Sequence, residues 1–507
     1  MSLPKSYGIA RGWPLGPGQS SPSSGTPTPT PTPTVGTLLG GFETTTDWTP
    51  AAGYTVTLDP VRKVQGQYSA RHVPSTALSN VRTYKDFPGF DMQNLGAVAF
   101  YTALDDDYDW QNASAVSGSA LVNATGTIYT IAGTTQLSLY STGGLWHAGS
   151  FAQAPAGVKA AGVGTHRFQV VNTLASAKIN DISFDAFYHN VGGIGGVMLT
   201  FDDAYVDAID CLAIMQPLGI VGEAYIPTAQ IGTANKFSWV QAAQLKAGGW
   251  NIQLDGTTDD GAFTNLANPA AGVAALAAGK AELITRGLGT EASLNAFCYP
   301  FGIGGARTNG TRTEKASVTT LGATVTMADT AGITVGMRFV CMGAKRTNRV
   351  QSVAAGTVTL DEPVDTAVTA LPAAFIDDSG PFHGKKLQNA IRAAGWKWGR
   401  STYSGRMFVQ YGISPDMAIE FPATSASGLT LATFQTAVQA AIDNKQVLAI
   451  YCHTVRATGA PGVSLNWDIT EFQACMNWLK TQIDAGVVES VTTASLDQKY
   501  GNRTVPT

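Results

Sequence analysis

Short runs of alternating hydrophobic and polar residues fill the first part of the chain, over residues 35–192. The clearest of these runs are 137–141, 166–171 and 179–189. A period of two residues is typical of strands that are buried on one face. Turn residues separate such runs about every ten residues, as in all-β domains. The pattern predicts a β-sandwich, of jelly-roll type, over residues 35–192.

After residue 192, continuous apolar runs alternate with runs of helical spacing. The strand-like runs are 196–201, 221–227, 251–255, 295–302 and 447–453, and the helical runs are 204–216, 239–249, 270–287 and 385–396. Continuous apolar runs indicate strands that are buried on both faces. Ser238 is expected to cap the helix that follows it. Alternation of strand and helix predicts a parallel sheet or (β/α) barrel over residues 193–306 and 379–500.

The alternation is interrupted over residues 307–378, where the pattern becomes β-like. We interpret this stretch as a small β-module inserted into a loop of the barrel. Surface loops accept insertions because the entropy cost of loop closure rises slowly with length. The expected fold class is therefore multidomain, α/β plus all-β: a β-sandwich, a (β/α) barrel and an inserted β-module.

The N-terminal region is expected to carry a spacer. Residues 21–34 are rich in alternating Thr and Pro, which favours an extended linker. Residues 1–20 are too few for a domain and are either a docking segment or disordered. They contain no apolar stretch of a secretory signal, and no run anywhere is long enough for a transmembrane helix.

Composition excludes several classes of protein. Only 13% of residues are charged and the net charge is −4, so neither nucleic acid nor a membrane surface is an expected partner. Five scattered cysteines, without a CxxC pair, argue against a disulfide scaffold and a cysteine zinc site.

Polar motifs stand at the predicted ends of four barrel strands. They are TFDD (200–203), LDGTTDD (254–260), FCYPFG (297–302) and IYCHT (450–454). In parallel α/β folds, active sites collect at the carboxyl ends of the strands. Alone, the adjacent Asp202 and Asp203 would fit an ordinary helix N-terminus. Together with the other three motifs they indicate an active site.

In order and spacing, the four motifs resemble those of the polysaccharide deacetylases, the NodB-homology carbohydrate esterases. The resemblance covers residues 197–302 and 380–498 and is carried by TFDD, YPFG and the late histidine. It implies a distorted (β/α) barrel of the polysaccharide deacetylase type. It also implies a divalent metal ion and the removal of N- or O-acetyl groups from sugars.

The resemblance assigns roles to individual residues. Asp202 matches the general base that activates the attacking water, and Asp203 matches a metal-binding aspartate. His453 matches the general acid that protonates the leaving group. A carboxylate that takes a proton and an imidazole that returns one form a coherent set for acyl transfer.

Two further positions match less closely. Tyr299 and Pro300 fall in the motif whose backbone amide helps to hold the oxyanion. Arg400 falls in the region where the family places a residue that orients the catalytic carboxylate. A surface arginine is the alternative interpretation of Arg400.

The sequence departs from the family at the metal. Where the family has two histidines four residues apart, this chain has Asp255 and Asp259, and Asp260 is an alternative to Asp259. Cys298 replaces the usual arginine before Tyr299. Oxygen ligands suit Mg, Mn or Ca, whereas the family's imidazoles suit Zn. Either one harder divalent cation is bound, or the metal is lost and the barrel is a sugar-binding relic.

These expectations lead to a functional hypothesis. The order of domains is typical of a phage tail spike or fibre that deacetylates acetylated bacterial polysaccharide, capsule or O-antigen, and that belongs to the virion. Other tail or baseplate proteins are expected partners of the N-terminus, and a homo-oligomer is left open. One alternative is a non-catalytic receptor-binding protein that uses the same groove. Another is a bacterial cell-wall deacetylase, against which the lack of a secretory signal argues.

Overall fold

The structure is a computed structural model of the chain. It describes residues 37–46, 48–50, 54–60, 67–74, 80–91, 98–104, 117–124, 127–130, 147–151, 163–173, 182–189, 194–256, 269–299, 312–341, 343–345, 347–377, 386–402, 408–409, 419, 421–444, 446–458, 460 and 465–500. The predicted N-terminal segment and Thr/Pro linker lie outside these residues, as does the predicted strand 137–141.

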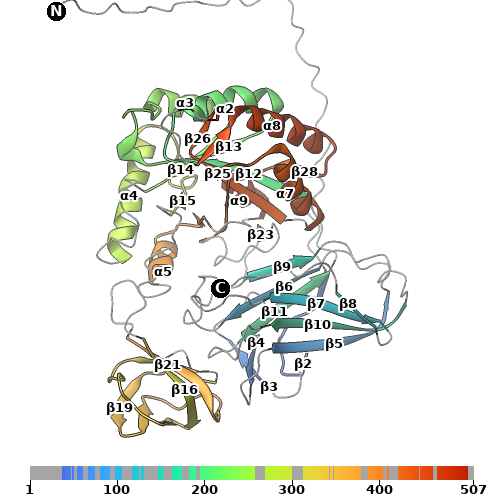
Figure 1. Cartoon of the computed structure of the whole chain (residues 1–507), viewed down its shortest axis with the longest axis vertical. Coiled ribbons are helices and arrows are strands. Elements are labelled where there is room, and N and C mark those ends of the chain that lie inside the picture. The colour runs from blue at the N-terminus through green and yellow to red at the C-terminus, as the bar shows by residue number, and fades with distance from the viewer. Residues whose placement is uncertain are drawn as a thin grey trace, which may run out of the picture. The chain divides into compact units, whose positions relative to one another are not determined.

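Two antiparallel sheets form the region predicted to be a sandwich (Figure 1). The first has the order β3-β4-β11-β6-β9, with β1 beside β11, and the second has the order β2-β5-β10-β7-β8. The first sheet's strands are β1 (Thr37–Gly40), β3 (Tyr54–Asp59), β4 (Ser69–Pro74), β6 (Val98–Leu104), β9 (His147–Phe151) and β11 (Ile182–His189). The second sheet's strands are β2 (Thr49–Pro50), β5 (Asn80–Asp91), β7 (Ser117–Ala124), β8 (Thr127–Thr130) and β10 (Val163–Thr173).

The strand predictions for this region are confirmed where the structure describes it. Strand β10 contains the predicted run 166–171, and β11 covers residues 182–189 of the predicted run 179–189. Aromatic packing joins the two sheets. Phe42, which follows β1, stacks on Trp48 with ring centroids 5.0 Å apart, and Trp48 meets Phe87 of β5 edge to face. The jelly-roll connectivity stays a prediction.

A curled, mostly parallel sheet of nine described strands positions the candidate site. Its order is β22-β15-β14-β13-β12-β25-β23, with β24 beside β25 and β28 beside β12. Only β23 runs antiparallel among these pairings of described strands. The strands are β12 (Gly195–Phe201), β13 (Gly222–Ile226), β14 (Asn251–Leu254), β15 (Ala296–Cys298), β22 (Trp398–Arg400), β23 (Phe408–Val409), β24 (Thr424–Ser425), β25 (Gln446–Cys452) and β28 (Val488–Ser490).

Helices surround this sheet and bury its apolar side chains (Figure 1). They are α2 (Asp207–Met215), α3 (Trp239–Ala247), α4 (Pro269–Thr285), α5 (Lys386–Ala393), α7 (Leu431–Asn444), α8 (Ile469–Asp484) and α9 (Thr493–Tyr500). Strand β12 is buried along its whole length, as its continuous apolar run predicted. In the part of the chain that the structure describes, no helix is both long and apolar enough to cross a membrane.

Local chemistry sets where two of these helices begin. Ser238 caps α3 as predicted: its hydroxyl accepts the amide of Gln241, and the Gln241 side chain accepts the amide of Ser238. Helix α2 begins at Asp207, three residues later than expected. The delay arises because Asp203 and Ala204 have left-handed backbone conformations, with φ of 62° and 58°.

The stretch 307–378 contains six antiparallel strands that pair with one another in the order β18-β21-β16-β17-β20-β19. They are β16 (Arg312–Leu321), β17 (Thr324–Met327), β18 (Arg338–Cys341), β19 (Val350–Ala354), β20 (Thr357–Leu360) and β21 (Leu371–Ile376). An isolated bridge between Arg338 and Arg349 connects the two edge strands. The side chains between the strands form their own apolar cluster, which includes Val325, Phe339 and Phe375.

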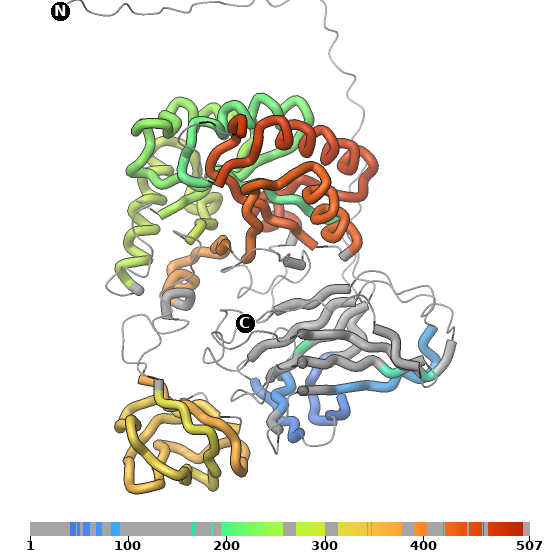
Figure 2. Tube along the Cα trace, viewed as in Figure 1, coloured from blue at the N-terminus to red at the C-terminus, as the bar shows by residue number. Residues whose placement is uncertain are grey.

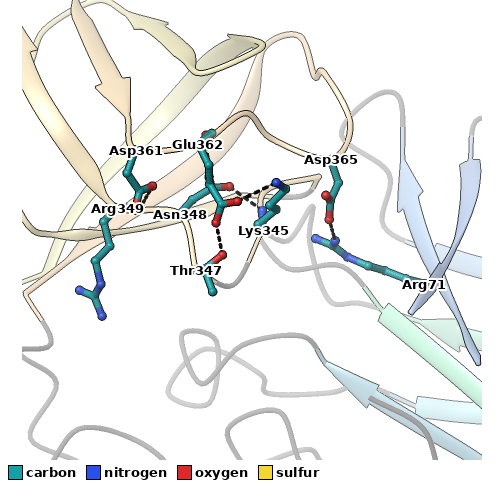
Figure 3. A network of polar contacts seen from close by, with 8 residues as sticks. All are labelled: Arg71, Lys345, Thr347, Asn348, Arg349, Asp361, Glu362 and Asp365. Atoms are coloured by element: carbon teal, nitrogen blue, oxygen red, sulfur yellow. Dashed lines mark hydrogen bonds and ion pairs between the residues drawn. The ribbon is translucent and has the colours of Figure 1, made fainter. Parts of the chain in front are cut away.

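A polar network holds the turn between β18 and β19 (Figure 3). The ammonium group of Lys345 donates to Glu362 over 2.7 Å, and the amide of Lys345 donates to the Asn348 side chain over 2.6 Å. Asn348 in turn donates to the carbonyl of Glu362 over 2.9 Å. The hydroxyl of Thr347 also bonds to the Glu362 carboxylate. Glu362 thus anchors the turn through both its side chain and its backbone.

Candidate active site

The carboxyl ends of five strands meet at one edge of the curled sheet. Strands β12 and β25 pair in parallel so that Phe201 lies beside Cys452, although about half of the chain separates them (Figure 2). In the same way, Cys298 at the end of β15 lies beside Arg400 at the end of β22. Strand β14 ends at Leu254, directly before Asp255. The motifs singled out in the sequence therefore reach the same edge.

Asp202 and Arg400 form a buried ion pair. Nη2 of Arg400 lies 2.6 Å from Oδ2 of Asp202, and the side chains are 2% and 4% exposed. The guanidinium lies between two aromatic rings, with its carbon 5.4 Å from the ring centre of Tyr225 and 4.9 Å from that of Tyr451. The alternative of a surface arginine is thus wrong. Arg400 contacts the carboxylate that the resemblance assigned as the base.

Burial and charge act in opposite directions on this pair. Burial raises the pKa of Asp202 above its ordinary value, while the positive charge of Arg400 opposes that rise. Burial by itself would lower the pKa of Arg400, but the neighbouring Asp202 carboxylate raises it above its ordinary value. Arg400 therefore remains a cation. Oδ1 of Asp202 is buried and has no hydrogen-bond partner among the described residues.

Asp203 faces His453. Oδ2 of Asp203 lies 3.4 Å from Nδ1 of His453, whose side chain is 21% exposed. The left-handed conformation of Asp203 sends consecutive carboxylates in different directions, one to Arg400 and the other to His453. The amide of Asp202 donates to the carbonyl of Cys452 over 3.0 Å, which fixes the two strand ends to each other.

Asp255 is the third buried carboxylate of the site and is 3% exposed. Its pKa is raised well above the ordinary value, first by burial and then by the negative charges of Asp203 and Asp202. Burial, and then the negative charge of Asp255, raises the pKa of the neighbouring Cys298 thiol well above its ordinary value. Cys298 therefore stays a neutral thiol beside Asp255.

Tyr299 is buried, and its polar groups are bonded within the fold. Its hydroxyl donates to the carbonyl of Ile419 over 2.8 Å, and its amide donates to the carbonyl of Arg400 over 3.0 Å. Pro300 and the predicted ligand Asp259 lie outside the described residues. The oxyanion role of Tyr299 and Pro300 stays a prediction.

The site holds more buried carboxylates than permanent cations. Three buried carboxylates, Asp202, Asp203 and Asp255, face one permanent cation, Arg400. Such an excess of buried negative charge is costly unless a cation or protons neutralise it. Carboxylate oxygens are the ligands that Mg, Mn and Ca prefer. Among the described residues, no group of three His, Cys, Asp or Glu side chains is arranged to hold a metal ion, so the predicted ligand set still depends on Asp259.

The sequence interpretation missed several neighbours of the site. Tyr205 lies parallel to His453, with ring centroids 6.0 Å apart, and the ammonium group of Lys236 lies 3.6 Å from the Tyr205 ring centre. Asp207 pairs with Arg456 over 2.8 Å. Spacing offered a signal for this pair, because Asp207 follows Asp203 by four residues and Arg456 follows His453 by three.

No protein-family model matches the chain, and no curated protein matches its sequence. Among solved structures, the chain is similar to a deacetylase, PplD, from Streptococcus pyogenes in complex with acetate. The identity is 21% and the TM-score 0.19, over 21% of this chain and 46% of that one. It is also similar to a family 4 carbohydrate esterase from Streptomyces lividans, with 10% identity and a TM-score of 0.29, over 59% of this chain and 92% of the other.

A third similarity is to the enzymatically active domain of tailspike protein 4 from bacteriophage CBA120. The identity is 13% and the TM-score 0.19, over 29% of this chain and 20% of that one. This chain thus spans less than half the length of the Streptococcus deacetylase and a fifth of the tailspike structure.

Proposed function

We propose that the chain is a metal-dependent deacetylase, a carbohydrate esterase that acts on acetylated bacterial surface polysaccharide. One observation carries the proposal: adjacent carboxylates at the end of β12 each have their own partner from a different strand. Asp202 pairs with Arg400, and Asp203 faces His453. An ordinary helix N-terminus does not need such partners, because there the carboxylate serves the amides of its own helix.

The two pairs suit a division of labour in acyl transfer. Arg400 holds Oδ2 of Asp202, which leaves Oδ1 to accept a proton from the attacking water. The raised pKa of Asp202 makes it a stronger base than an exposed aspartate. Asp203 holds Nδ1 of His453, which leaves Nε2 to deliver a proton to the leaving oxygen or nitrogen.

A divalent cation is part of the proposal. Asp203, Asp255 and Asp259 would hold it, and their oxygen donors favour Mg, Mn or Ca over Zn. When bound, the cation would polarise the acyl oxygen and lower the pKa of water.

Acetate release tests the proposal directly. The full chain is incubated with acetylated capsule, O-antigen and acetylated oligosaccharides, after chelation and again after addition of Mg, Mn, Ca or Zn. We expect acetate release that chelation abolishes and one of the cations restores. The proposal is contradicted if the folded protein releases no acetate from any of these substrates with any of these cations.

A second candidate is a receptor-binding protein without catalytic activity that uses the same groove. The observation in its favour is the carboxylate at position 255, where the related enzymes have a histidine, combined with the lack of a three-donor group among the described residues. This candidate requires that the chain bind the polysaccharide without releasing acetate. For either function, we propose a setting in the virion of a phage, with the N-terminal segment as the attachment to other tail or baseplate proteins.

A further inference from the structure

Asp207, the first residue of α2, directs its carboxylate away from its own helix. Oδ2 accepts the amide of Val455 over 3.2 Å, and both oxygens accept Nε of Arg456, over 2.9 and 2.8 Å. Asp207 is 5% exposed, so these bonds are shielded from water. Charge-assisted hydrogen bonds in such surroundings are stronger than those at the surface. Asp207 thus ties α2 to the segment that follows His453.

Two contacts between an acidic and a basic side chain connect the same two segments of the chain. Asp203 contacts His453, and four residues further on Asp207 contacts Arg456, three residues after His453. The first contact is the longer one, at 3.4 Å, and involves a partly exposed histidine. The second is shorter, at 2.8 Å, and its aspartate is as buried as Asp203. The shorter contact therefore lies three residues after the candidate catalytic histidine in the chain.

The opposite side of the same segment is also fixed. Strand β26 (Thr454–Arg456) pairs with β27 (Asn466–Asp468), and the Asn466 side chain accepts both the hydroxyl of Thr454 and the amide of Arg456, each over 3.0 Å. His453 stands at the junction of β25 and β26, where its amide makes a long bond of 3.5 Å to the carbonyl of Leu465. The position of His453 thus depends on the bonds that fix β26.

We propose that Asp207 is a positioning residue, which through Val455 and Arg456 holds His453 against Asp203. The inference rests on the proposed function for its consequence in catalysis, but the positioning itself is a property of the fold. A small displacement of a proton donor lowers the rate strongly, because proton transfer requires a short distance and a correct alignment between donor and acceptor. Asp207 contacts no reacting atom and acts only through His453.

The test compares Asp207→Ala with Asp210→Ala in the full chain. Asp210 is the matched control, because it lies in the same first turn of α2 and its side chain is exposed. The first readout is the nuclear Overhauser contact between the rings of Tyr205 and His453, which lie parallel at 6.0 Å. The second is the exchange rate of the Val455 amide. Neither readout requires enzymatic activity.

We expect Asp207→Ala to lose the ring contact and to speed exchange at Val455 at least about tenfold, while Asp210→Ala changes neither. In the acetate assay we expect kcat to fall about 10- to 100-fold with KM nearly unchanged. Asp207→Asn keeps an acceptor for the Val455 amide and should recover part of the loss. A merely structural role would lower the yield of folded enzyme without this split between kcat and KM.

The inference is overturned if Asp207→Ala retains the ring contact and the slow exchange of Val455. If Asp207→Ala does not fold, Arg456→Met, which keeps most of the apolar stem but removes the guanidinium group, is tested with the same readouts. If the unchanged chain releases no acetate, the proposed function fails, whereas the ring contact and the amide exchange still decide whether Asp207 positions His453.

Discussion

The guanidinium of Arg400 and the carboxylate of Asp202 lie 2.6 Å apart inside the sheet, although 198 residues separate them in the sequence. Both side chains are almost completely buried. Loss of one partner would leave the other as an uncompensated charge in an apolar environment, which is much costlier than loss of a surface pair.

Arg400→Gln should therefore destabilise the protein by about 3–5 kcal/mol, as measured by urea unfolding. The control is Lys397→Gln, which removes an exposed partner of Asp497 and should cost less than about 1 kcal/mol. Equal losses in the two variants would contradict the structural importance of the Asp202–Arg400 pair.

Asp202→Asn should separate chemistry from metal binding. The change keeps the shape of the side chain but removes the proton acceptor, so acetate release should fall by about two to four orders of magnitude. Affinity for the divalent cation, measured by calorimetry, should stay close to that of the unchanged protein. Asp203→Asn should lower both acetate release and cation affinity, because it removes a charged ligand. If the two variants lose cation affinity equally, the division of roles between the neighbours is wrong.

Replacement of the two unusual carboxylates tests the nature of the metal site. Asp255→His combined with Asp259→His should shift the preference from Mg, Mn or Ca towards Zn, because imidazole is the better ligand for Zn. Competition titrations with the purified proteins measure this shift. A gain of both metal and acetate release only in the double variant would identify the present chain as a binding module.

The left-handed turn at the site should carry measurable strain. Ala204 has a φ of 58°, where its Cβ costs about 1–2 kcal/mol that a glycine avoids. Ala204 is also buried, and loss of its methyl group costs roughly 0.8 kcal/mol. Ala204→Gly should thus be neutral or slightly stabilising in urea unfolding. Ala213→Gly, at an exposed position within α2, should instead destabilise by about 1 kcal/mol. Similar losses in both variants would show that the turn is unstrained.

His72 should make stability depend on pH. It is fully buried in β4, and burial lowers its pKa from 6.5 to about 3. Below pH 6.5 the unfolded chain binds a proton that the folded chain excludes, so the free energy of unfolding decreases as pH falls from 6.5 towards 3. The slope should be about 1.4 kcal/mol per pH unit.

His72→Gln provides the comparison, because it cannot take up that proton. Unfolding of the two proteins is measured at a series of pH values between 3.5 and 7, and the difference between them isolates His72. As the pH falls in that window, the free energy of unfolding of the unchanged protein should decrease relative to that of the His72→Gln variant. A difference that is independent of pH would mean that His72 is protonated equally in the folded and unfolded states.

Five strands of the curled sheet could be predicted from the sequence because they are buried on both faces, which leaves continuous apolar runs such as that of β12. The start of α2 could not, because an apolar pattern does not reveal left-handed residues such as Asp203 and Ala204. Polar residues at strand ends indicated where the site would form. The partners within it depend on pairing between distant strands.

Arg400 and Asp207 illustrate this limit. The resemblance placed Arg400 where a residue orients the catalytic carboxylate but left a surface arginine open, and β-sheet register brings Arg400 to Asp202. Asp207 similarly meets Val455 only because β25 lies beside β12. Conversely, Asp255 was found from its place after a strand, and the structure shows it near Asp202 and Asp203.

The pairing of β12 with β25 constrains how the chain acquires its fold during synthesis. Strand β12 lacks this neighbour until the ribosome has added Cys452. Contacts between such distant segments form slowly, because a long loop must close first. Meanwhile the apolar β12 presents an open edge on which other chains can pair. Nascent chains that stop before β25 are therefore expected to aggregate or to bind chaperones, whereas the completed chain covers this edge.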